Sequence, residues 1–313
     1  MLRYLLKRSA FMVVTVLAVC AMTFGLMNII PGGTAELILK HTFLELEEIP
    51  TDEQIAEISS RYNLHDPLYI QFSRWMGNAL HGDLGTSYIL KRPVTYLILL
   101  RLPATMMLAL AAMSIAVLIG VPLGVLCALK ENKLADYILR IATLIGVSMP
   151  GFWLALLLIL VFSVTLKLFP VAGYGNISYL VLPAVALSAH TTAITLRMVR
   201  TGMLEVMNQP YIVFAMSKGL PTRYIVTKHA MRNALLPVIT VLGLHLGHML
   251  GGAVVIETIF AWPGVGSLLV NSIMARDVPV VQGCVLTIVG VFVIINLLVD
   301  LLYTYIDPRI KYV

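Results

Sequence analysis

Long runs of apolar residues without a single charged side chain divide this chain into regular blocks. Each run is 22 to 29 residues long, and about 20 residues of helix suffice to cross the hydrocarbon core of a bilayer. The pattern therefore predicts an all-α integral membrane protein with six transmembrane helices. The six charge-free runs are Ser9–Ile30, Leu102–Leu129, Ile141–Leu166, Leu168–Leu196, Asn233–Ile256 and Val278–Val299.

The first and fourth runs need separate interpretation. The first is longer than the apolar region of a cleaved signal peptide and leads into Pro31-Gly32-Gly33, so we expect a retained helix. The fourth contains Gly173-Tyr174-Gly175-Asn176 and Pro183, which disfavour a helix. Its helix is therefore expected only from about Pro183 to Arg200.

The longest polar segment is residues 31–101, between the first and second runs. Thr51–Arg61 is expected to form a short helix with Thr51 as its N-cap. Tyr69–Leu80 has apolar residues at helical spacing, which predicts a helix on the membrane surface or against the transmembrane helices. The chain is thus divided into a tail with the first helix (1–30), this segment (31–101), a transmembrane core (102–305) and a C-terminal tail (306–313).

Composition supports the membrane class and excludes others. Hydrophobic residues make up 59% of the chain and charged residues only 12%, with a mean hydropathy of +0.91. Soluble domains carry about 25% charged residues, so a soluble enzyme and a disordered protein are both excluded. The net charge of +6 would fit nucleic acid, but basic cytoplasmic loops explain it better. All three cysteines fall inside apolar runs, so no disulfide framework is expected.

The basic residues also predict the orientation in the membrane. Of the 22 Lys and Arg residues, 14 lie in segments 1–8, 130–140, 197–232 and 306–313, whereas the short loops between hold only Lys167 and Arg276. Cytoplasmic loops are enriched in Lys and Arg. Both termini are therefore expected in the cytoplasm, and residues 31–101 outside it.

Motifs for chemistry are missing from the sequence. It contains no phosphate-binding loop, no G-x-S-x-G nucleophile elbow and no H-E-x-x-H zinc motif. We therefore expect neither an enzyme nor a nucleotide-binding chain. If the protein transports a solute, the energy must come from an ion gradient or from a partner.

The third basic segment contains a predicted helical hairpin, residues 205–232. Pro210 and Pro221 each mark the start of a helix, and Gly219 between them can adopt the left-handed conformation that ends one. The expected result is a short helix, a tight turn and a second short helix leading into the fifth run. Such a hairpin suits docking into a groove on a cytoplasmic partner; the alternative is an ordinary basic loop.

The same segment carries a resemblance to a known family. Ala215–Gly219 (AMSKG), followed by Pro237, resembles the EAA loop of permease subunits in ATP-driven (ABC) importers. Val213, Phe214 and Arg232 depart from the general form of that motif, and such changes occur in the peptide/nickel branch of these permeases. Further matches to that branch are Gly82–Ser87 (GDLGTS), Leu102–Thr105 (LPAT), Gly146–Trp153 (GVSMPGFW), Arg232–Pro237 (RNALLP), Phe260–Gly266 (FAWPGVG) and Asp307–Arg309 (DPR).

The resemblance implies a division of labour in a prokaryotic cell membrane. Two permease subunits would form the pathway, two cytoplasmic ATPase subunits would bind ATP and Mg, and an external binding protein would deliver the substrate. Coupling to the ATPase is then expected at Ala215, Gly219, Leu220 and Pro221. The chain most resembles the first permease subunit of nickel importers, so nickel or a nickel chelate is the expected substrate. The alternative is a dipeptide, an oligopeptide or glutathione.

Four ionisable residues within the predicted helices are candidates for the substrate pathway. His190 lies in the fourth run, and His245 and His248 lie one turn apart in the fifth. Polar groups within a membrane usually face the bundle interior or a pathway, although interhelical hydrogen bonds would explain these histidines equally. Glu257 at the outer end of the fifth run either lines an outer gate or pairs with Arg276. No residue set establishes a metal site.

Glycines recur every four residues on the fifth run, at Gly243, Gly247 and Gly251, and Gly252 follows directly. A stripe of small residues lets another helix approach closely. The fifth helix is therefore expected at a helix–helix interface, such as one with the second permease.

Two other classes of transporter remain as alternatives. An ion-coupled secondary transporter would predict buried charge pairs and a repeated fold, and neither is evident in the sequence. A passive channel would need no hairpin for docking an ATPase.

Overall fold

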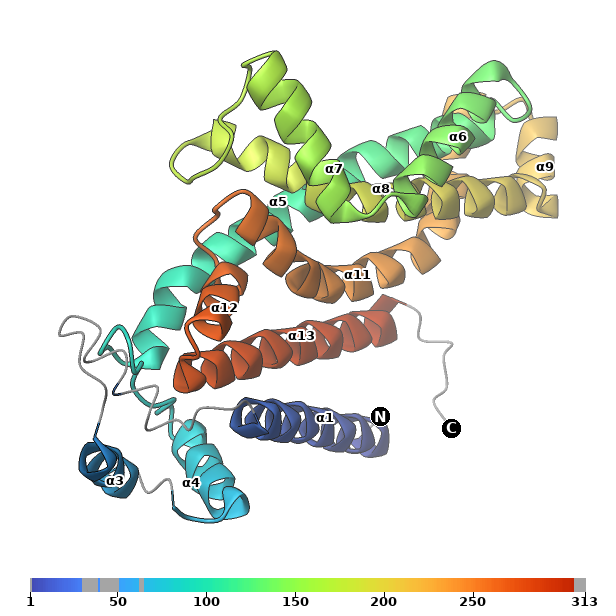
Figure 1. Ribbon diagram of the computed structural model, residues 1–313. Coiled ribbons are helices and arrows are strands. Elements are labelled where there is room, and N and C mark those ends of the chain that lie inside the picture. The colour runs from blue at the N-terminus through green and yellow to red at the C-terminus, as the bar shows by residue number, and fades with distance from the viewer. Residues whose placement is uncertain (1, 30–38, 40–50, 62–64, 307–313) are drawn as a thin grey trace. The chain divides into compact units, whose positions relative to one another are not determined.

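The computed structural model describes residues 2–29, 39, 51–61 and 65–306 (Figure 1). Predictions for the rest of the chain, including residues 40–50 and the tail with Asp307–Arg309, lie outside the described residues. In the described part the backbone is helical, with a single isolated β-bridge between Thr86 and Pro93 and no longer strand. The prediction of an all-helical protein is confirmed.

Among the described residues, five helices are long and apolar enough to cross a membrane, and a bent pair is a sixth candidate if it forms one span. This agrees with the six predicted crossings. The orientation of the chain in the bilayer stays a prediction. In chain order the elements are α1 (Leu2–Ile29), α3 (Asp52–Arg61), α4 (Leu68–Leu80), α5 (Val94–Leu129), α6 (Leu134–Ser148), α7 (Gly151–Leu158), the π-helical η1 (Ile159–Thr165), α8 (Ile177–Met207), α9 (Pro210–Ser217), α10 (Thr222–Tyr224), the π-helical η2 (Ile225–Ala230), α11 (Met231–Ile259), α12 (Val265–Met274) and α13 (Val278–Ile306).

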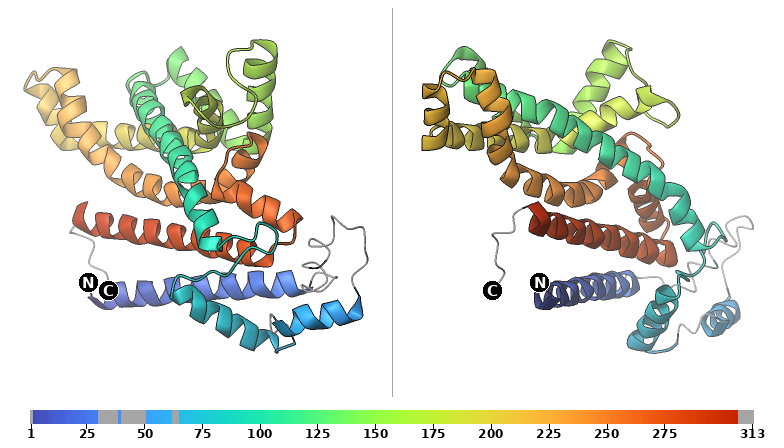
Figure 2. Two further views of the ribbon diagram at one scale, coloured as in Figure 1. Left: turned by 90° about the vertical axis from the view of Figure 1, so that its left-hand side faces the viewer. Right: turned by 180° about the vertical axis from the view of Figure 1, so that it is seen from behind.

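The third crossing is not one straight helix. It bends by 108° between α6 and the segment formed by α7 and η1, both green in Figure 1 and Figure 2. Met149 leaves the helical conformation, with φ −82° and ψ 124°, and Pro150 caps α7. A proline disfavours the α conformation of the residue before it, so Met149-Pro150 places the bend.

The fourth crossing is longer than predicted. The expectation of a helix from Pro183 to Arg200 is wrong, because α8 runs from Ile177 to Met207. The side chain of Asn176 caps its first turn by accepting a hydrogen bond from the Ser178 amide at 3.0 Å. An internal proline removes one hydrogen bond of the helix, and here the cap and the burial of Pro183 offset that loss.

The second helix also begins earlier than its charge-free run. α5 begins at Val94, so the last residues of the predicted 31–101 segment belong to this helix. With 36 residues it is about 54 Å long at 1.5 Å per residue, longer than a bilayer core of about 30 Å. The charged Arg101 interrupts the apolar pattern without ending the helix, because charge alone does not break helical geometry.

The chain divides into two compact units, which are described separately. Among the described residues, the first unit comprises those within 2–104 and 263–293. In it Thr51 caps α3 as predicted, since its Oγ1 accepts from the Gln54 amide at 3.4 Å and its own amide donates to Gln54 Oε1 at 2.9 Å. The predicted helix at Tyr69–Leu80 is confirmed as α4, which meets α1 through an edge-to-face contact of Phe24 and Phe72.

The loop with the Gly82–Ser87 motif is hydrogen-bonded to Asp277 in the first unit. The Ser87 hydroxyl donates a hydrogen bond to the Asp277 carboxylate, and the Tyr88 amide donates to the same group at 3.1 Å. Asp277 is buried, with 3% of its surface exposed. This loop is therefore held to the start of α13, above an apolar cluster of Leu84, Val94, Leu97, Ile98, Val265, Leu268, Val280 and Cys284.

Among the described residues, the second unit comprises 105–262 and 294–306, and it is organised around α8. α6, α7 and α11 all pack against α8. Glycines permit close approaches to α8: a Cβ at Gly124 of α5 would lie 2.7 Å from Val199 Cβ, and one at Gly146 of α6 would lie 3.0 Å from Ala193 Cβ. Neither position has room for a larger residue.

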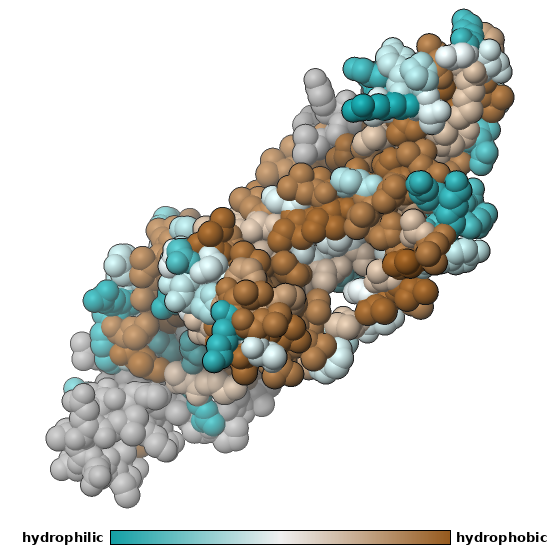
Figure 3. Space-filling view, turned by 90° about the horizontal axis from the view of Figure 1, so that it is seen from above, coloured by the Kyte–Doolittle hydropathy of each residue, from teal (hydrophilic) through white to brown (hydrophobic). Residues whose placement is uncertain are grey.

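The outer surfaces of the helices are strongly apolar. Hydrophobic residues cover broad areas of the visible face in Figure 3. Leu118 is 74% exposed, Leu144 68% and Ile177 79%. Lipid covers such surfaces in a helical membrane protein, so their exposure agrees with the predicted class.

Candidate functional site

The structure contains the predicted hairpin, and its turn lies at Gly219 as predicted. α9 begins with Pro210 as its first residue, and the turn after it contains Gly219 at φ +77°. Pro221 caps the next helix as expected. That helix is not a separate short one, because α10, η2 and α11 continue as one 38-residue helix.

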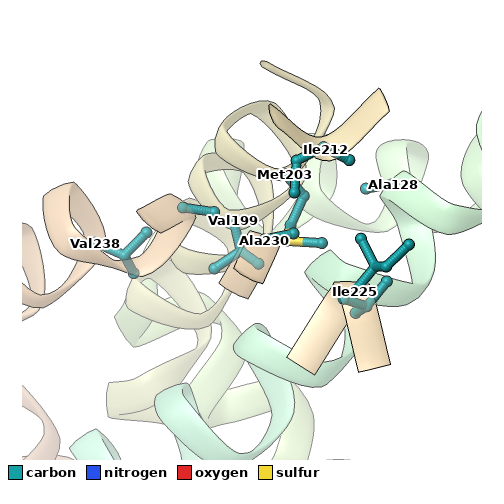
Figure 4. Packing of buried hydrophobic residues seen from close by; sticks show 9 residues of the cluster. Ala128, Val199, Met203, Ile212, Ile225, Ala230 and Val238 are labelled. Carbon is teal, nitrogen blue, oxygen red and sulfur yellow. The ribbon is translucent and has the colours of Figure 1, made fainter. Parts of the chain in front are cut away.

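A buried apolar cluster joins the hairpin to the membrane helices (Figure 4). Ile212 of α9 is fully buried and lies beside Met203 of α8, while Ile225 and Ala230 come from η2. Ala128, Val199, Val226, Ala234 and Val238 complete the cluster from α5, α8, η2 and α11. A rigid-body displacement of the hairpin would therefore act directly on α8 and α11.

The other face of the hairpin is open and apolar. Val213 is 53% exposed and Phe214 61%, and the Lys218 ammonium lies 4.6 Å from the centre of the Phe214 ring. Of the predicted coupling residues, Ala215 packs partly against the buried cluster, and the others lie exposed at the turn. The exposed coupling residues are Gly219, Leu220 and Pro221.

The three predicted pathway histidines come together at one cavity. The ring centres of His190 and His245 are 6.2 Å apart, and those of His245 and His248 are 6.3 Å apart. They line a cavity of about 320 Å³ whose wall includes Met149 and Phe152 from the bend between α6 and α7. The bend and the histidines, distant in sequence, thus form one feature.

This arrangement does not form a metal centre. Within the described residues no group of three or more His, Cys, Asp or Glu side chains is placed to hold a metal ion. Imidazoles in this cavity can donate and accept hydrogen bonds.

Glu257 does not line the histidine cavity. It is fully buried, and its Oε1 accepts a hydrogen bond from the Thr105 hydroxyl of α5 at 2.7 Å. Its neighbour Ile256 does reach the cavity. Glu257 thus ties α11 to α5, and its expected pairing with Arg276 stays a prediction. Thr105 is the last residue of the LPAT motif, the one signal in the sequence that singles it out.

Sequence reasoning missed a second polar cluster. Asp136 of α6 is fully buried and bound by Arg200 of α8 through two hydrogen bonds of 2.8 and 2.9 Å. The Cys127 thiol and the Asn132 amide donate to the same carboxylate at 2.9 and 3.0 Å. The cluster fastens the end of α5, the following loop and α6 to α8.

Two family models match the chain. The model described as "Binding-protein-dependent transport system inner membrane component" matches residues 120–312. The model described as "Binding-prot-dependent transport system membrane comp, N-term" matches residues 1–109. Together they match all of the chain except residues 110–119 and Val313.

Relatives match over nearly the whole chain. A putative peptide transport system permease protein of Brucella abortus (strain 2308) is 43% identical, covering 98% of each chain. An oligopeptide transport system permease protein of Bacillus subtilis (strain 168) is 38% identical and a glutathione transport system permease protein of Salmonella paratyphi A is 37% identical, each covering 100% of both chains.

A solved structure is similar to this chain in fold only, because the sequence identity is low. A chain of the MetNI methionine ABC transporter, in an inward-facing conformation, has a TM-score of 0.56 at 17% sequence identity. The similarity covers 68% of this chain and 97% of that chain.

Proposed function

The chain belongs to the family of binding-protein-dependent transport system inner membrane components, and we propose that it forms half of the translocation pathway of an importer for peptides. It is a multi-pass inner-membrane permease subunit of an ABC importer and has no ATPase site of its own. The proposal of a peptide substrate is supported by the full-length similarity, at 37% to 43% identity, to permeases named for peptides and glutathione. The expectation of nickel has less support than this alternative.

The proposed partners are a second permease subunit, two ATPase subunits and an external binding protein. In this proposal the exposed face of α9 and the turn at Gly219 dock into a cleft of one ATPase subunit. Two features support this role: the apolar exposure of Phe214, and the burial of Ile212 behind it. Closure of the ATPase pair on ATP would then move α8 and α11 through the buried cluster and switch the permease between inward- and outward-open states.

The proposed pathway passes the histidine cavity. His190, His245 and His248 offer N–H donors and ring-nitrogen acceptors, which match the carbonyl, amide and terminal groups of a short peptide. Glu257 acts from behind this cavity by holding α11 to α5 through Thr105. The bend at Met149-Pro150 places the start of α7 against the same cavity.

Uptake by the reconstituted complex tests the substrate. Vesicles containing both permeases and the ATPase pair, with the binding protein outside and ATP inside, are given a labelled dipeptide or radioactive nickel. We expect ATP-dependent accumulation of the peptide, competed by unlabelled peptide, and no accumulation of nickel. Brisk nickel uptake without peptide uptake would overturn the proposal.

A further inference from the structure

A second cavity, of about 490 Å³, lies between α6 and α8, apart from the histidine cavity. Two contacts between these antiparallel neighbours bound it along α6: the ion pair of Asp136 with Arg200, and the close approach of Gly146 to Ala193. The ten residues from Asp136 to Gly146 correspond to about 15 Å of helix. α6 and α8 are thus held together at two points along the cavity.

The polar side of this cavity carries an excess of positive charge. Arg140, Arg197 and Arg200 line it. Arg200 is neutralised by Asp136, whereas within the described residues no acidic side chain pairs with Arg140 or Arg197. Arg140 instead lies 5.9 Å from the centre of the Tyr137 ring. Two guanidinium groups are therefore available to an anion, and a guanidinium binds phosphate oxygens in pairs.

The other side of the cavity is apolar and continues onto the outer surface of α6. Ile141 and Leu144 line the cavity and are 58% and 68% exposed. A small hydrophilic anion would leave this wall in contact with water. A phospholipid would use both sides, with its phosphate on the arginines and an acyl chain along Ile141 and Leu144.

We propose that the cavity between α6 and α8 binds an anionic phospholipid of the cytoplasmic leaflet, with Arg140 and Arg197 holding the phosphate. The inference rests on the proposed orientation, which places segments 130–140 and 197–232 at the cytoplasmic boundary. Basic pockets between transmembrane helices on that side bind anionic headgroups. A bound lipid there would join α6 to α8 next to the Asp136–Arg200 pair.

Native mass spectrometry of the intact importer in an uncharged detergent, titrated with phosphatidylglycerol, tests the proposal. The wild type is expected to bind one phosphatidylglycerol per copy of this chain, and phosphatidylcholine much more weakly. Arg140→Gln with Arg197→Gln is expected to weaken this binding at least about tenfold, because hydrogen bonds to charged groups are lost. Arg140→Lys with Arg197→Lys, which keeps the charge but not the paired donors, is expected to lie between.

The matched control is Lys130→Gln with Lys133→Gln, which removes the same charge at exposed positions outside the cavity. This variant is expected to bind lipid as the wild type does. Equal loss in both double variants, no loss in the arginine variant, or equal binding of phosphatidylcholine would overturn the site. Displacement of the lipid by glycerophosphate at equal concentration would assign the cavity to small anions and overturn it too. Lipid counting needs no transport, so failure of peptide uptake would refute the proposed function and leave this readout unaffected.

Discussion

Asp136 is a fully buried carboxylate in the second unit, and its burial depends on the donors around it. A fully buried carboxylate is costly unless it is paired and hydrogen-bonded, and four donors meet that requirement here. They come from the Cys127 thiol, the Asn132 amide, and Nε and Nη2 of Arg200. Because these donors belong to three different parts of the chain, Asp136 holds α5, α6 and α8 in one arrangement.

Asp136→Asn is expected to destabilise the permease by about 3 kcal/mol, since it leaves the partly buried Arg200 without its counter-charge. The midpoint of thermal unfolding of the purified complex should fall by several degrees. Glu131→Gln, at an exposed position five residues earlier, is the control and should leave the midpoint unchanged. Equal midpoints for the two variants would contradict this role.

The role of a residue could be predicted from the sequence where it depends on neighbouring residues in the chain. The turn at Gly219 and the caps at Thr51 and Pro221 follow from neighbouring residues, so they could be predicted. The Asp136–Arg200 pair joins residues 64 apart and the Glu257–Thr105 bond residues 152 apart. No local pattern predicts such partners, so these contacts required the structure.

At the scale of elements, the glycine stripe on α11 has more than one neighbour. A Cβ at Gly243 would come within 2.4 Å of Val299 Cγ2 on α13, whereas one at Gly251 would meet nothing within 4 Å. Gly252 has only an ordinary contact, at 3.5 Å from Leu187. The predicted helix–helix interface is thus confirmed at Gly243 within this chain, and an interface with a second permease stays a prediction.

Gly243→Ala is therefore expected to destabilise the permease by about 1–3 kcal/mol through overpacking against α13. Gly251→Ala makes the same chemical change on the same helix in open space. It should be neutral or slightly stabilising, because alanine favours a helix over glycine by about 1 kcal/mol. Thermal unfolding of the two variants side by side measures this; a larger loss at Gly251 would contradict the packing.

The hairpin combines an anchored face with an open one. Phe214→Asp should reduce the amount of ATPase that co-purifies with the permease at least about tenfold, because it places a charge in an apolar contact. Permease stability should stay unchanged, since Phe214 is 61% exposed. Thr227→Ala, exposed on η2 with a hydroxyl bonded inside its own helix, serves as the control. Undiminished ATPase recovery with Phe214→Asp would place the docking surface elsewhere.

For the whole molecule, the sequence predicted the all-helical membrane class but not the course of the individual helices. The bend of 108° at Met149-Pro150 and the full length of α8 both differ from the charge-free runs. Charge marks where a helix leaves the membrane, whereas prolines and caps decide where it bends or begins. The identity of the substrate is even harder to predict from the sequence, because the histidine cavity offers hydrogen bonds that many polar solutes could use.

In the proposed function, this chain forms half of a pathway and a docked ATPase supplies the energy. Uptake of a labelled dipeptide can be compared between vesicles that contain this chain alone and vesicles that contain the complete importer. We expect accumulation only in vesicles with the complete importer, external binding protein and internal ATP, and none when ATP is omitted. Concentrative uptake by this chain alone, driven by an imposed proton gradient, would refute the role of the ATPase.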